Sequence, residues 1–430
     1  MRMKFSRSSQ LVLVAAASLA AASLITACET LTVDFVFVAS SKAAGPNQYG
    51  EINVFEINSE SGRMRQIPTS PFPSEGRNPV AEAVSADYGS LFVANHDDNT
   101  IVQFVIGNDG KLYPYNTVNT PGIYPLAIAA NKSNLFVVDT YQPLALCSTA
   151  DPCSGSIAVY PLTAATGSNP VQMGMPATNS AVSGQYWPLT LSGANSSHVI
   201  VPTAVSLSAI GPFYVYVTAY DSSVTPYEGY VFAFSVGSGG ALTAVPASPF
   251  AAGTQPSAIA TGVATNGSSA TEVIYVTDSA KGDVLGYNVS GLPGSKGNLI
   301  PMTSGINGTN EFPAGNGPSG IVVDPSYSYA YVSNATDATV TAYSISGTGA
   351  LSRIGSYATG LQPVAMGIDP STNHFLFTVN FLDNTVSDFE LSTTAGTLLV
   401  AQDSPFATSA QPVAAAAIPH NGTGGGIPTQ

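Results

Sequence analysis

A proline recurs seven times along this chain of 430 residues, and each time it opens the same pattern of short apolar segments. A glycine often stands two or three places before it, as in Gly76-Arg77-Asn78-Pro79 and Gly360-Leu361-Gln362-Pro363. The seven are Pro79, Pro125, Pro202, Pro256, Pro318, Pro363 and Pro412. The repeat length is very roughly 45 to 75 residues, which includes the range of β-propeller blades. Seven prolines therefore predict seven blades.

Each unit contains four short strand patterns. A first strand of small and apolar residues, such as Leu126 to Ala130, follows the proline, and a second strand ends in a polar residue. Those polar residues are Asn95, Asp139, Asp278, Asn334 and Asn380. A turn, a third strand and a Gly-x-Leu signal that starts a fourth strand complete the unit. Four alternating strands per unit are typical of one propeller blade, so we predict an all-β, seven-bladed propeller over residues 33–419.

The second residue after each proline is small in every unit. It is Ala81, Ala127, Ala204, Ala258, Gly320, Ala365 or Ala414. Blades converge toward the axis of a propeller, so a larger side chain on the innermost strand would overpack the hub.

The two ends of the chain predict how the ring closes. The segment Phe35 to Val38 matches the second strand of a blade, and Pro412 to Ile418 matches a first strand with no blade after it. We therefore expect the two terminal strands to pair, which removes open sheet edges. Residues 139–200 depart from the repeat and predict insertions in blade three, and residues 420–430 predict a disordered tail.

The N-terminus predicts export and a lipid anchor. A basic start and an apolar stretch from Leu11 to Leu24, too short to span a bilayer, indicate a secretory leader over residues 1–27. The segment Ile25 to Cys28 resembles the lipobox of bacterial lipoproteins, in which the cysteine is acylated; the alternative is an ordinary leader that leaves a free thiol at Cys28. Glu29 after the cysteine favours the outer membrane in such proteins. Residues 28–32 then form a tether of roughly 20 Å, and we expect the bottom face, where the chain enters blade one, to face the membrane.

Charge and cysteine content narrow the partners further. The formal net charge is −14, and because Arg2, Lys4 and Arg7 lie in the leader, the mature chain is near −17, with 9 basic residues against 26 acidic ones. Phosphate backbones would be repelled, which excludes nucleic acid as a partner. Cys147 and Cys153 bracket a short loop and predict a disulfide in an exported protein. A metal site is the weaker interpretation because two thiols without neighbouring histidines are incomplete.

Blade two carries the candidate site. The third position after the proline is apolar in six units (Ile128, Val205, Ile259, Ile321, Met366 and Ala415) but is Glu82 in blade two. An acid at such a place must be paired or reach the water-filled channel. Arg77 lies in the loop before Pro79, and His96 lies in the neighbouring turn after Asn95. We hypothesise a cluster of Arg77, Glu82 and His96 on the top face; the alternative is that Glu82 is paired, His96 caps a turn and Arg77 is solvated.

Two sequence motifs resemble a known family. The strand ends Tyr275-Val276-Thr277-Asp278 and Tyr331-Val332-Ser333-Asn334 resemble the YVTN repeat, and Ser-Pro-Phe occurs three times, at residues 70–72, 248–250 and 404–406. Together they look like the seven-bladed lactonase-like propellers, which include 6-phosphogluconolactonases and muconate cycloisomerases. The resemblance implies lactone chemistry with His, Arg and Glu around the channel mouth. His96 or Glu82 would then be the general base for water and Arg77 would stabilise the oxyanion.

Two functions remain open from the sequence. One is a binding module that offers its top loops, with aromatic residues such as Tyr124, Trp187, Tyr220 and Phe381, to a small molecule, glycan or envelope protein. The other is an exported lactone hydrolase, and the scarcity of Lys and Arg argues against a phosphorylated substrate. We expect no cofactor and no metal, because the four histidines (His96, His198, His374 and His420) are scattered and no Cys-x-x-Cys-His occurs.

Overall fold

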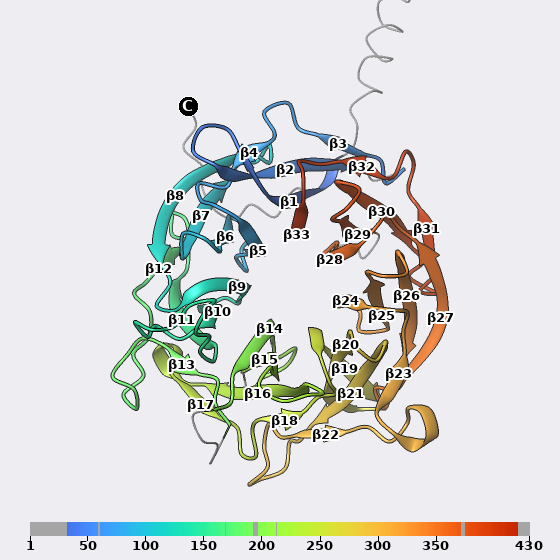
Figure 1. Ribbon diagram of the computed structural model, residues 1–430. Helices are drawn as coiled ribbons and strands as arrows, with labels where there is room; N and C mark the ends of the chain where they lie inside the picture. Colours follow the sequence, from blue (N-terminus) through green and yellow to red (C-terminus); the bar gives the residue numbers. More distant parts are fainter. Residues whose placement is uncertain are drawn as a thin grey trace, which may run out of the picture.

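The computed structural model describes residues 32–58, 61–167, 169–191, 197–211, 213–370 and 375–419. Their strands form seven antiparallel sheets arranged as a ring (Figure 1). Besides strands, this part of the chain has only two 3-10 turns, at Ser238–Gly240 and Ile306–Gly308. None of its helical segments has the length and apolar character of a membrane span. The predicted all-β, seven-bladed propeller is confirmed.

Blades 1 to 4 contain the following strands. Blade 1 has β33 (Pro412–Pro419), β1 (Thr32–Ala44), β2 (Tyr49–Asn58), β3 (Met64–Gln66) and β4 (Phe72–Pro73). Blade 2 has β5 (Pro79–Val84), β6 (Ser90–Asn95), β7 (Thr100–Ile106) and β8 (Leu112–Asn119). Blade 3 has β9 (Ile123–Ala130), β10 (Asn134–Tyr141), β11 (Ser156–Thr163), β12 (Gln172–Met173) and β13 (Trp187–Pro188). Blade 4 has β14 (Ile200–Leu207), β15 (Tyr214–Asp221), β16 (Glu228–Val236), β17 (Leu242–Ala244) and β18 (Phe250–Ala251).

Blades 5 to 7 repeat the same order. Blade 5 has β19 (Pro256–Asn266), β20 (Ser269–Asp278), β21 (Asp283–Val289), β22 (Leu299–Pro301) and β23 (Glu311–Pro313). Blade 6 has β24 (Pro318–Val323), β25 (Tyr329–Asn334), β26 (Thr339–Ile345) and β27 (Leu351–Ala358). Blade 7 has β28 (Pro363–Ile368), β29 (Phe375–Asn380), β30 (Thr385–Leu391), β31 (Leu398–Val400) and β32 (Phe406–Ala407).

The ring closes through its two terminal strands, as predicted. β33 pairs antiparallel with β1, with Phe37 opposite Ala416 and Val38 opposite Ala415. Blade 1 therefore takes its innermost strand from the C-terminal end and its next strands from the N-terminal end. This pairing leaves no blade open at the seam.

Every innermost strand has the same irregularity directly after its proline. In blade 2, Pro79 lies opposite Asn95 and Ala81 lies opposite Ala94, so Val80 has no partner. The same shift between the proline and the small residue two places later occurs in the other six blades. A one-residue bulge of this kind bends the strand, and proline fits beside it because it has no N–H to donate.

A buried polar side chain lies opposite the proline in six of the seven blades. These side chains, which we call the strand-end polar residues, are Ser40, Asn95, Asp139, Asp278, Asn334 and Asn380, and each is 0 % exposed. They hold the loop before the proline: Asp278 accepts hydrogen bonds from the N–H groups of Thr254 (2.6 Å) and Gln255 (3.1 Å). In blade 4, Ala219 takes this place.

The glycine three places before the proline allows this contact. A Cβ at Gly76, Gly122, Gly253, Gly315 or Gly360 would lie 2.2–2.7 Å from the strand-end polar side chain of its own blade. Such distances are shorter than any real Cβ contact, so in these five blades the loop can close on the side chain only because the residue is glycine. Blade 4 has neither the strand-end polar residue nor the glycine, and blade 1 has the smaller Ser40 with Ser409 in place of the glycine.

In the part of the chain that the structure describes, the hydrophobic core consists of seven clusters, one between each pair of neighbouring blades. One cluster packs Phe136 and Val138 of blade 3 against Val215 and Val217 of blade 4. Another, at the seam, packs Val36 and Val38 of blade 1 against Phe375, Phe377 and Val379 of blade 7. Burial of apolar surface therefore stabilises contacts between blades, and a blade without both neighbours would leave two apolar faces in water.

The glycine contact gives a test by stability. Gly360→Ala places a Cβ 2.6 Å from the Nδ2 atom of Asn380, so we expect the free energy of unfolding to fall by about 1–3 kcal/mol, as for other overpacked sites. Gly291→Ala is the matched control, because no atom lies within 4 Å of its added Cβ. Urea unfolding of both variants measures the difference. Equal stability of the two would show that the glycine contact is not required.

Candidate functional site

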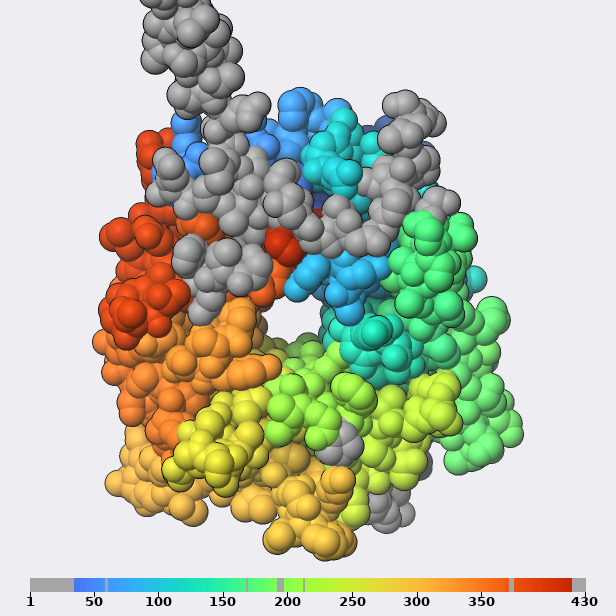
Figure 2. All heavy atoms as spheres, turned by 180° about the vertical axis from the view of Figure 1, so that it is seen from behind, coloured from blue at the N-terminus to red at the C-terminus, as the bar shows by residue number. Residues whose placement is uncertain are grey.

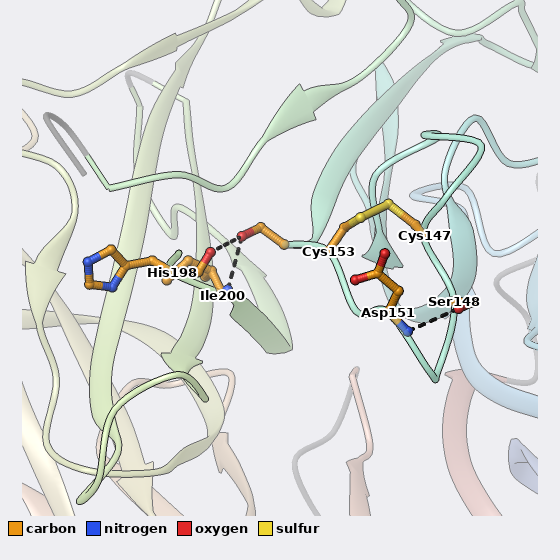
Figure 3. Close-up of a disulfide and its surroundings, with 7 residues drawn as sticks. Cys147, Ser148, Asp151, Cys153, His198 and Ile200 are labelled. Carbon is orange, nitrogen blue, oxygen red and sulfur yellow. Dashed lines mark hydrogen bonds between the residues drawn. A yellow bond between two sulfur atoms is a disulfide. The ribbon is translucent and has the colours of Figure 1, made fainter. Parts of the chain in front are cut away.

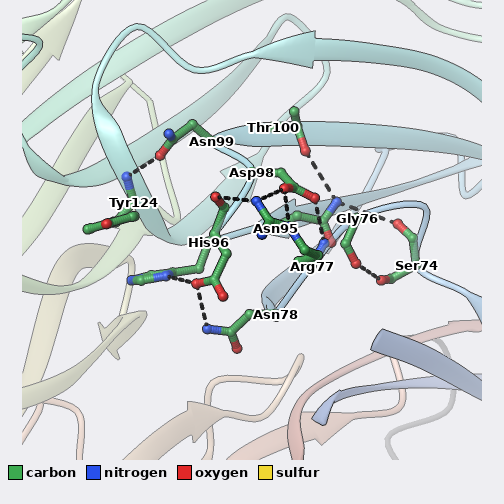
Figure 4. Close-up of polar contacts among 11 residues, drawn as sticks. Ser74, Gly76, Arg77, Asn78, Asn95, His96, Asp98, Asn99, Thr100 and Tyr124 are labelled. Carbon is green, nitrogen blue, oxygen red and sulfur yellow. Dashed lines mark hydrogen bonds and ion pairs between the residues drawn. The ribbon is translucent and has the colours of Figure 1, made fainter. Parts of the chain in front are cut away.

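The loops before the prolines and the turns after the second strands lie at one end of the ring, which we call the top. In blade 2 they are in direct contact (Figure 4). The N–H of Arg77 donates to Oδ2 of Asp98 (2.7 Å), and the N–H of His96 donates to the carbonyl of Asn78 (2.9 Å). Arg77 and His96, predicted to be neighbours on the top face, therefore belong to one cluster of loops.

Arg77 forms an ion pair on the surface of this cluster. Its side chain is 49 % exposed, and its guanidinium contacts Oδ1 of Asp98 through Nε (2.6 Å) and Nη2 (2.5 Å). The hydrogen bond and charge of Asp98 raise the pKa of Arg77, so the side chain stays cationic. The backbone part of this contact recurs in blades 6 and 7, where the N–H groups of Asn316 and Leu361 donate to aspartates (2.7 and 2.6 Å). Asp98 thus supports the loop through the backbone of residue 77, whichever side chain that residue has. The ion pair with Arg77 adds a contact that the equivalent loops of blades 6 and 7 do not have.

His96 is held by a carboxylate and an aromatic ring. Its Nδ1 lies 2.7 Å from Oδ1 of Asp97, and its ring stacks on Tyr124 of blade 3 with centroids 4.4 Å apart and an interplanar angle of 7°. Burial acts to raise the pKa of Asp97, but hydrogen bonds from His96 and Asn78 outweigh it and leave the pKa below its usual value. In a neutral imidazole, a carboxylate on Nδ1 favours the tautomer with the proton on Nδ1, in which Nε2 is the acceptor.

Tyr124 is positioned by an unusual backbone conformation. It precedes Pro125 with a φ of 62°, in the left-handed region that a bulky residue rarely adopts. Its N–H donates to Oδ1 of Asn99 (2.6 Å), and its carbonyl accepts from the hydroxyl of Thr140 (2.8 Å). The pair of rings, His96 and Tyr124, therefore bridges blades 2 and 3 at the top face, and we call it the aromatic pair.

Glu82 occupies a different environment. It lies on β5 opposite Val93, the position that Ile128, Ile259 and Ile321 occupy in their own blades. Both carboxyl oxygens are buried without a hydrogen bond of ordinary geometry. Burial raises the pKa of Glu82 well above its usual value, and only the nearby backbone of Ala39 in blade 1 opposes this. Within the described residues, no hydrogen bond or ion pair joins Glu82 to Arg77 or His96.

A second histidine–aspartate pair lies at the top of blade 4, where the sequence motifs predict no site residue. Nδ1 of His198 contacts Oδ2 of Asp221. Asp221 is 0 % exposed, and its Oδ1 accepts a hydrogen bond from the Ser223 hydroxyl (2.5 Å). Burial acts to raise the pKa of Asp221, but hydrogen bonds from Ser223 and His198 outweigh it and lower the pKa. Blade 4 lacks the usual glycine before Pro202, and that departure is the sequence signal that marks this segment.

The predicted disulfide between Cys147 and Cys153 is present, in the top loop between β10 and β11 (Figure 3). The next residue, Ser154, holds the His198 segment: its hydroxyl donates to the carbonyl of His198 (3.2 Å) and accepts from the N–H of Ile200 (3.0 Å). The disulfide loop of blade 3 is therefore tied to the histidine-bearing loop of blade 4. Cys28, His374 and His420 lie outside the described residues.

Three hollows lie away from the candidate site. They have volumes of about 320, 400 and 240 Å³ and are lined by residues of blades 1 and 7, of blades 3 and 4, and of blades 2 and 3, respectively. Arg77, Glu82 and His96 line none of these three. Among the described residues, no three His, Cys, Asp or Glu side chains are grouped as metal ligands would be.

Comparison with known proteins shows which parts of the chain follow a common pattern. Residues 48–168 and 229–414 match the family described as "Lactonase, 7-bladed beta-propeller". No curated protein matches the sequence. Arg77, Glu82 and His96 lie inside the matched segments, whereas the His198–Asp221 pair lies in the unmatched stretch between them.

Solved structures share the architecture. A candidate 6-phosphogluconolactonase from Bacteroides fragilis has a TM-score of 0.65 at 18 % identity and covers 91 % of this chain and 99 % of its own. The periplasmic gluconolactonase of Pseudomonas aeruginosa has a TM-score of 0.65 at 16 % identity, with 90 % and 99 % covered. A candidate 6-phosphogluconolactonase from Bacteroides uniformis has a TM-score of 0.63 at 16 % identity, also with 90 % and 99 % covered. At such identities the likeness shows the fold alone.

The environment of Glu82 predicts how stability depends on pH. Because its pKa is raised in the folded state, its ionisation destabilises the fold, and the wild type loses stability as pH rises through that pKa. Glu82→Ile removes this loss and restores the residue type of blades 3, 5 and 6, so we expect the free energy of unfolding at pH 8 to rise by about 1–3 kcal/mol. The gain should be smaller at pH 5.

Urea unfolding at the two pH values measures this gain. Ligand binding and lactone turnover of Glu82→Ile are the control. A more stable variant with unchanged binding and turnover would exclude Glu82 from the functional site. If Glu82→Ile is less stable than the wild type and also loses ligand binding, Glu82 is part of the functional site.

Proposed function

We propose a function from one premise: the chain belongs to the seven-bladed lactonase β-propeller family, as its repeat motifs predicted. On this premise, it is a lipid-anchored envelope protein that binds a ligand at its top face. The observation that carries this proposal is the aromatic pair. His96 and Tyr124 stack in parallel, are partly exposed and are braced from two blades. Flat ring surfaces beside a few fixed polar groups are typical of small-molecule and sugar sites.

The charges of the top face favour a neutral ligand. Asp97, Asp98, Asp151, Asp337 and Asp383 all lie on top loops and are at least partly exposed. The guanidinium of Arg77 is already paired with Asp98. A phosphorylated or strongly anionic ligand would meet repulsion here, whereas hydroxyl groups of a glycan or sugar lactone find carboxylate acceptors. We therefore place polyhydroxylated neutral molecules first among the ligands.

The second candidate function is hydrolysis of a lactone, and the family match is the observation that favours it. In this mechanism Nε2 of His96 takes a proton from water while Asp97 holds Nδ1, and the resulting hydroxide attacks the lactone carbonyl. Arg77 stabilises the oxyanion of the tetrahedral intermediate. Collapse breaks the ring C–O bond, and the imidazolium returns its proton to the leaving alkoxide. Lactone and water thus give a hydroxy acid.

One experiment separates the two functions. Wild type, His96→Ala and His198→Ala are compared by titration calorimetry with the neutral molecules D-glucose and D-glucono-1,5-lactone. Proton release from a panel of sugar and aryl lactones is measured for the same three proteins. For a binding module we expect binding without turnover, weakened about ten-fold in His96→Ala because the ring stack is lost. For a hydrolase we expect turnover that falls by about 10²- to 10⁴-fold.

His198→Ala is the matched control, because His198 is also a top-face histidine with an aspartate on Nδ1. It should leave binding and turnover unchanged. Loss in His198→Ala alone would move the site to blade 4. Neither binding nor turnover on any compound would contradict both functions.

The anchor is a separate part of the proposal. It is supported by the apolar leader and by the segment Ile25 to Cys28, which lie outside the described residues. We expect Cys28→Ala to abolish labelling by radioactive palmitate and to remove the mature protein from detergent extracts of the outer membrane. Palmitate labelling that persists in Cys28→Ala would contradict acylation at this residue.

A further inference from the structure

The bottom loops of blades 3 to 5 differ in charge from the rest of this acidic chain. They comprise residues 131–133, 164–171, 208–213, 237–241, 267–268 and 290–298, which contain no Asp or Glu but two lysines, Lys132 and Lys296. Figure 2 views the ring from this face, with these loops coloured from teal through green and yellow to gold. The acidic side chains of the top loops lie on the opposite face.

The two lysines are exposed and have no ion pair among the described residues. Five of the nine basic residues after the leader form ion pairs: Arg63, Arg65, Arg77, Lys111 and Lys281. Lys132 and Lys296 do not, although acidic residues greatly outnumber basic ones. Their charge is therefore available to an external anion.

Exposed apolar side chains lie on the same loop as one of these lysines and on a loop next to the other. Phe213 is 62 % exposed and Leu292 is 67 % exposed, both on bottom loops. Lys132 and Phe213 line the same hollow of about 400 Å³ between blades 3 and 4. Tyr214 packs against Gly297, with ring atoms 2.7 Å from where a Cβ would lie, and so joins the Phe213 loop to the loop of Leu292 and Lys296. We call Lys132, Phe213, Leu292 and Lys296 the basal patch.

Two acidic residues lie near the basal patch, and neither forms an ion pair with Lys132 or Lys296. Glu272, at the base of β20, is 5 % exposed and accepts the N–H of Ala209 (3.0 Å), and burial raises its pKa to about 7. Asp87 of blade 2 shares a smaller hollow with Lys132, but its carboxylate accepts from the Ser85 hydroxyl (2.5 Å) and the Gly89 N–H (3.2 Å).

We propose that the basal patch rests on an anionic lipid surface, with Phe213 and Leu292 inserted among the lipids and Lys132 and Lys296 against phosphate headgroups. Apolar side chains flanked by lysines bind lipid interfaces by combined burial and electrostatic attraction. The first described residue, Thr32, starts β1 at the same end of the ring, four residues after Cys28. Because blade 1 lies across the ring from blades 4 and 5 (Figure 1), the patch and the anchor point would hold the bottom face flat on the membrane.

The test uses residues 29–430, so that its outcome does not depend on the lipid anchor or on the ligand at the top face. This piece keeps every described strand, including the β1–β33 pair that closes the ring. Co-sedimentation is measured with vesicles of 30 % phosphatidylglycerol in phosphatidylethanolamine and with vesicles of phosphatidylcholine alone. We expect binding to the anionic vesicles and little to the neutral ones.

Paired variants separate the two contributions. Lys132→Gln with Lys296→Gln should weaken binding to anionic vesicles about twenty-five-fold, since each lysine near an anionic surface contributes about five-fold. Phe213→Ser with Leu292→Ser should weaken it at least ten-fold. Leu361→Ser with Leu382→Ser, on the top loops and 55 % and 60 % exposed, is the matched control and should bind as wild type does.

Three results would overturn the proposal. The first is that the protein does not bind anionic vesicles, and the second is that it binds both vesicle types equally. The third is that the top-loop control loses as much binding to anionic vesicles as the basal variants do. The first would leave a protein partner as the occupant of this face.

Discussion

In six blades the top face depends on one contact, between the strand-end polar residue and the loop before the proline. Asp278 shows the principle: its carboxylate is fully buried and holds the two backbone N–H groups of the loop before Pro256. Buried polar groups are stable only when they are hydrogen-bonded, so the side chain requires the loop and the loop requires the side chain. The glycine that faces it follows from the closeness of that contact.

This repeated framework leaves a few positions on each blade free to differ. In blade 2 they carry Arg77 and His96, in blade 6 Asn316, and in blade 7 Leu361. Their backbone hydrogen bonds are alike, so their side chains change the chemistry of the top face without changing the fold. The chemical differences between the blades thus lie on loops whose geometry is fixed elsewhere.

Charge divides the two faces of the ring in the same way. The top loops gather exposed aspartates, whereas the bottom loops of blades 3 to 5 have only lysines. Both charge patterns lie on loops that merely connect the strands, so neither pattern is needed for packing of the blades. A neutral ligand at the top and an anionic surface at the bottom are the partners that this division favours.

The sequence by itself determined the architecture, because seven prolines, the small residues after them and the strand-end polar residues are local signals of one repeating contact. It also determined the closing strands, the disulfide and the loops that hold Arg77 and His96. Only the tertiary structure decided how the candidate residues lie. It separates Glu82, whose carboxyl is buried beside blade 1, from His96, which stacks on a tyrosine of blade 3. It pairs His198 with Asp221 across 23 positions. The contacts of Glu82 and His96 depend on how neighbouring blades pack, and the His198–Asp221 pair depends on how two loops of blade 4 meet, so local sequence signals do not predict them.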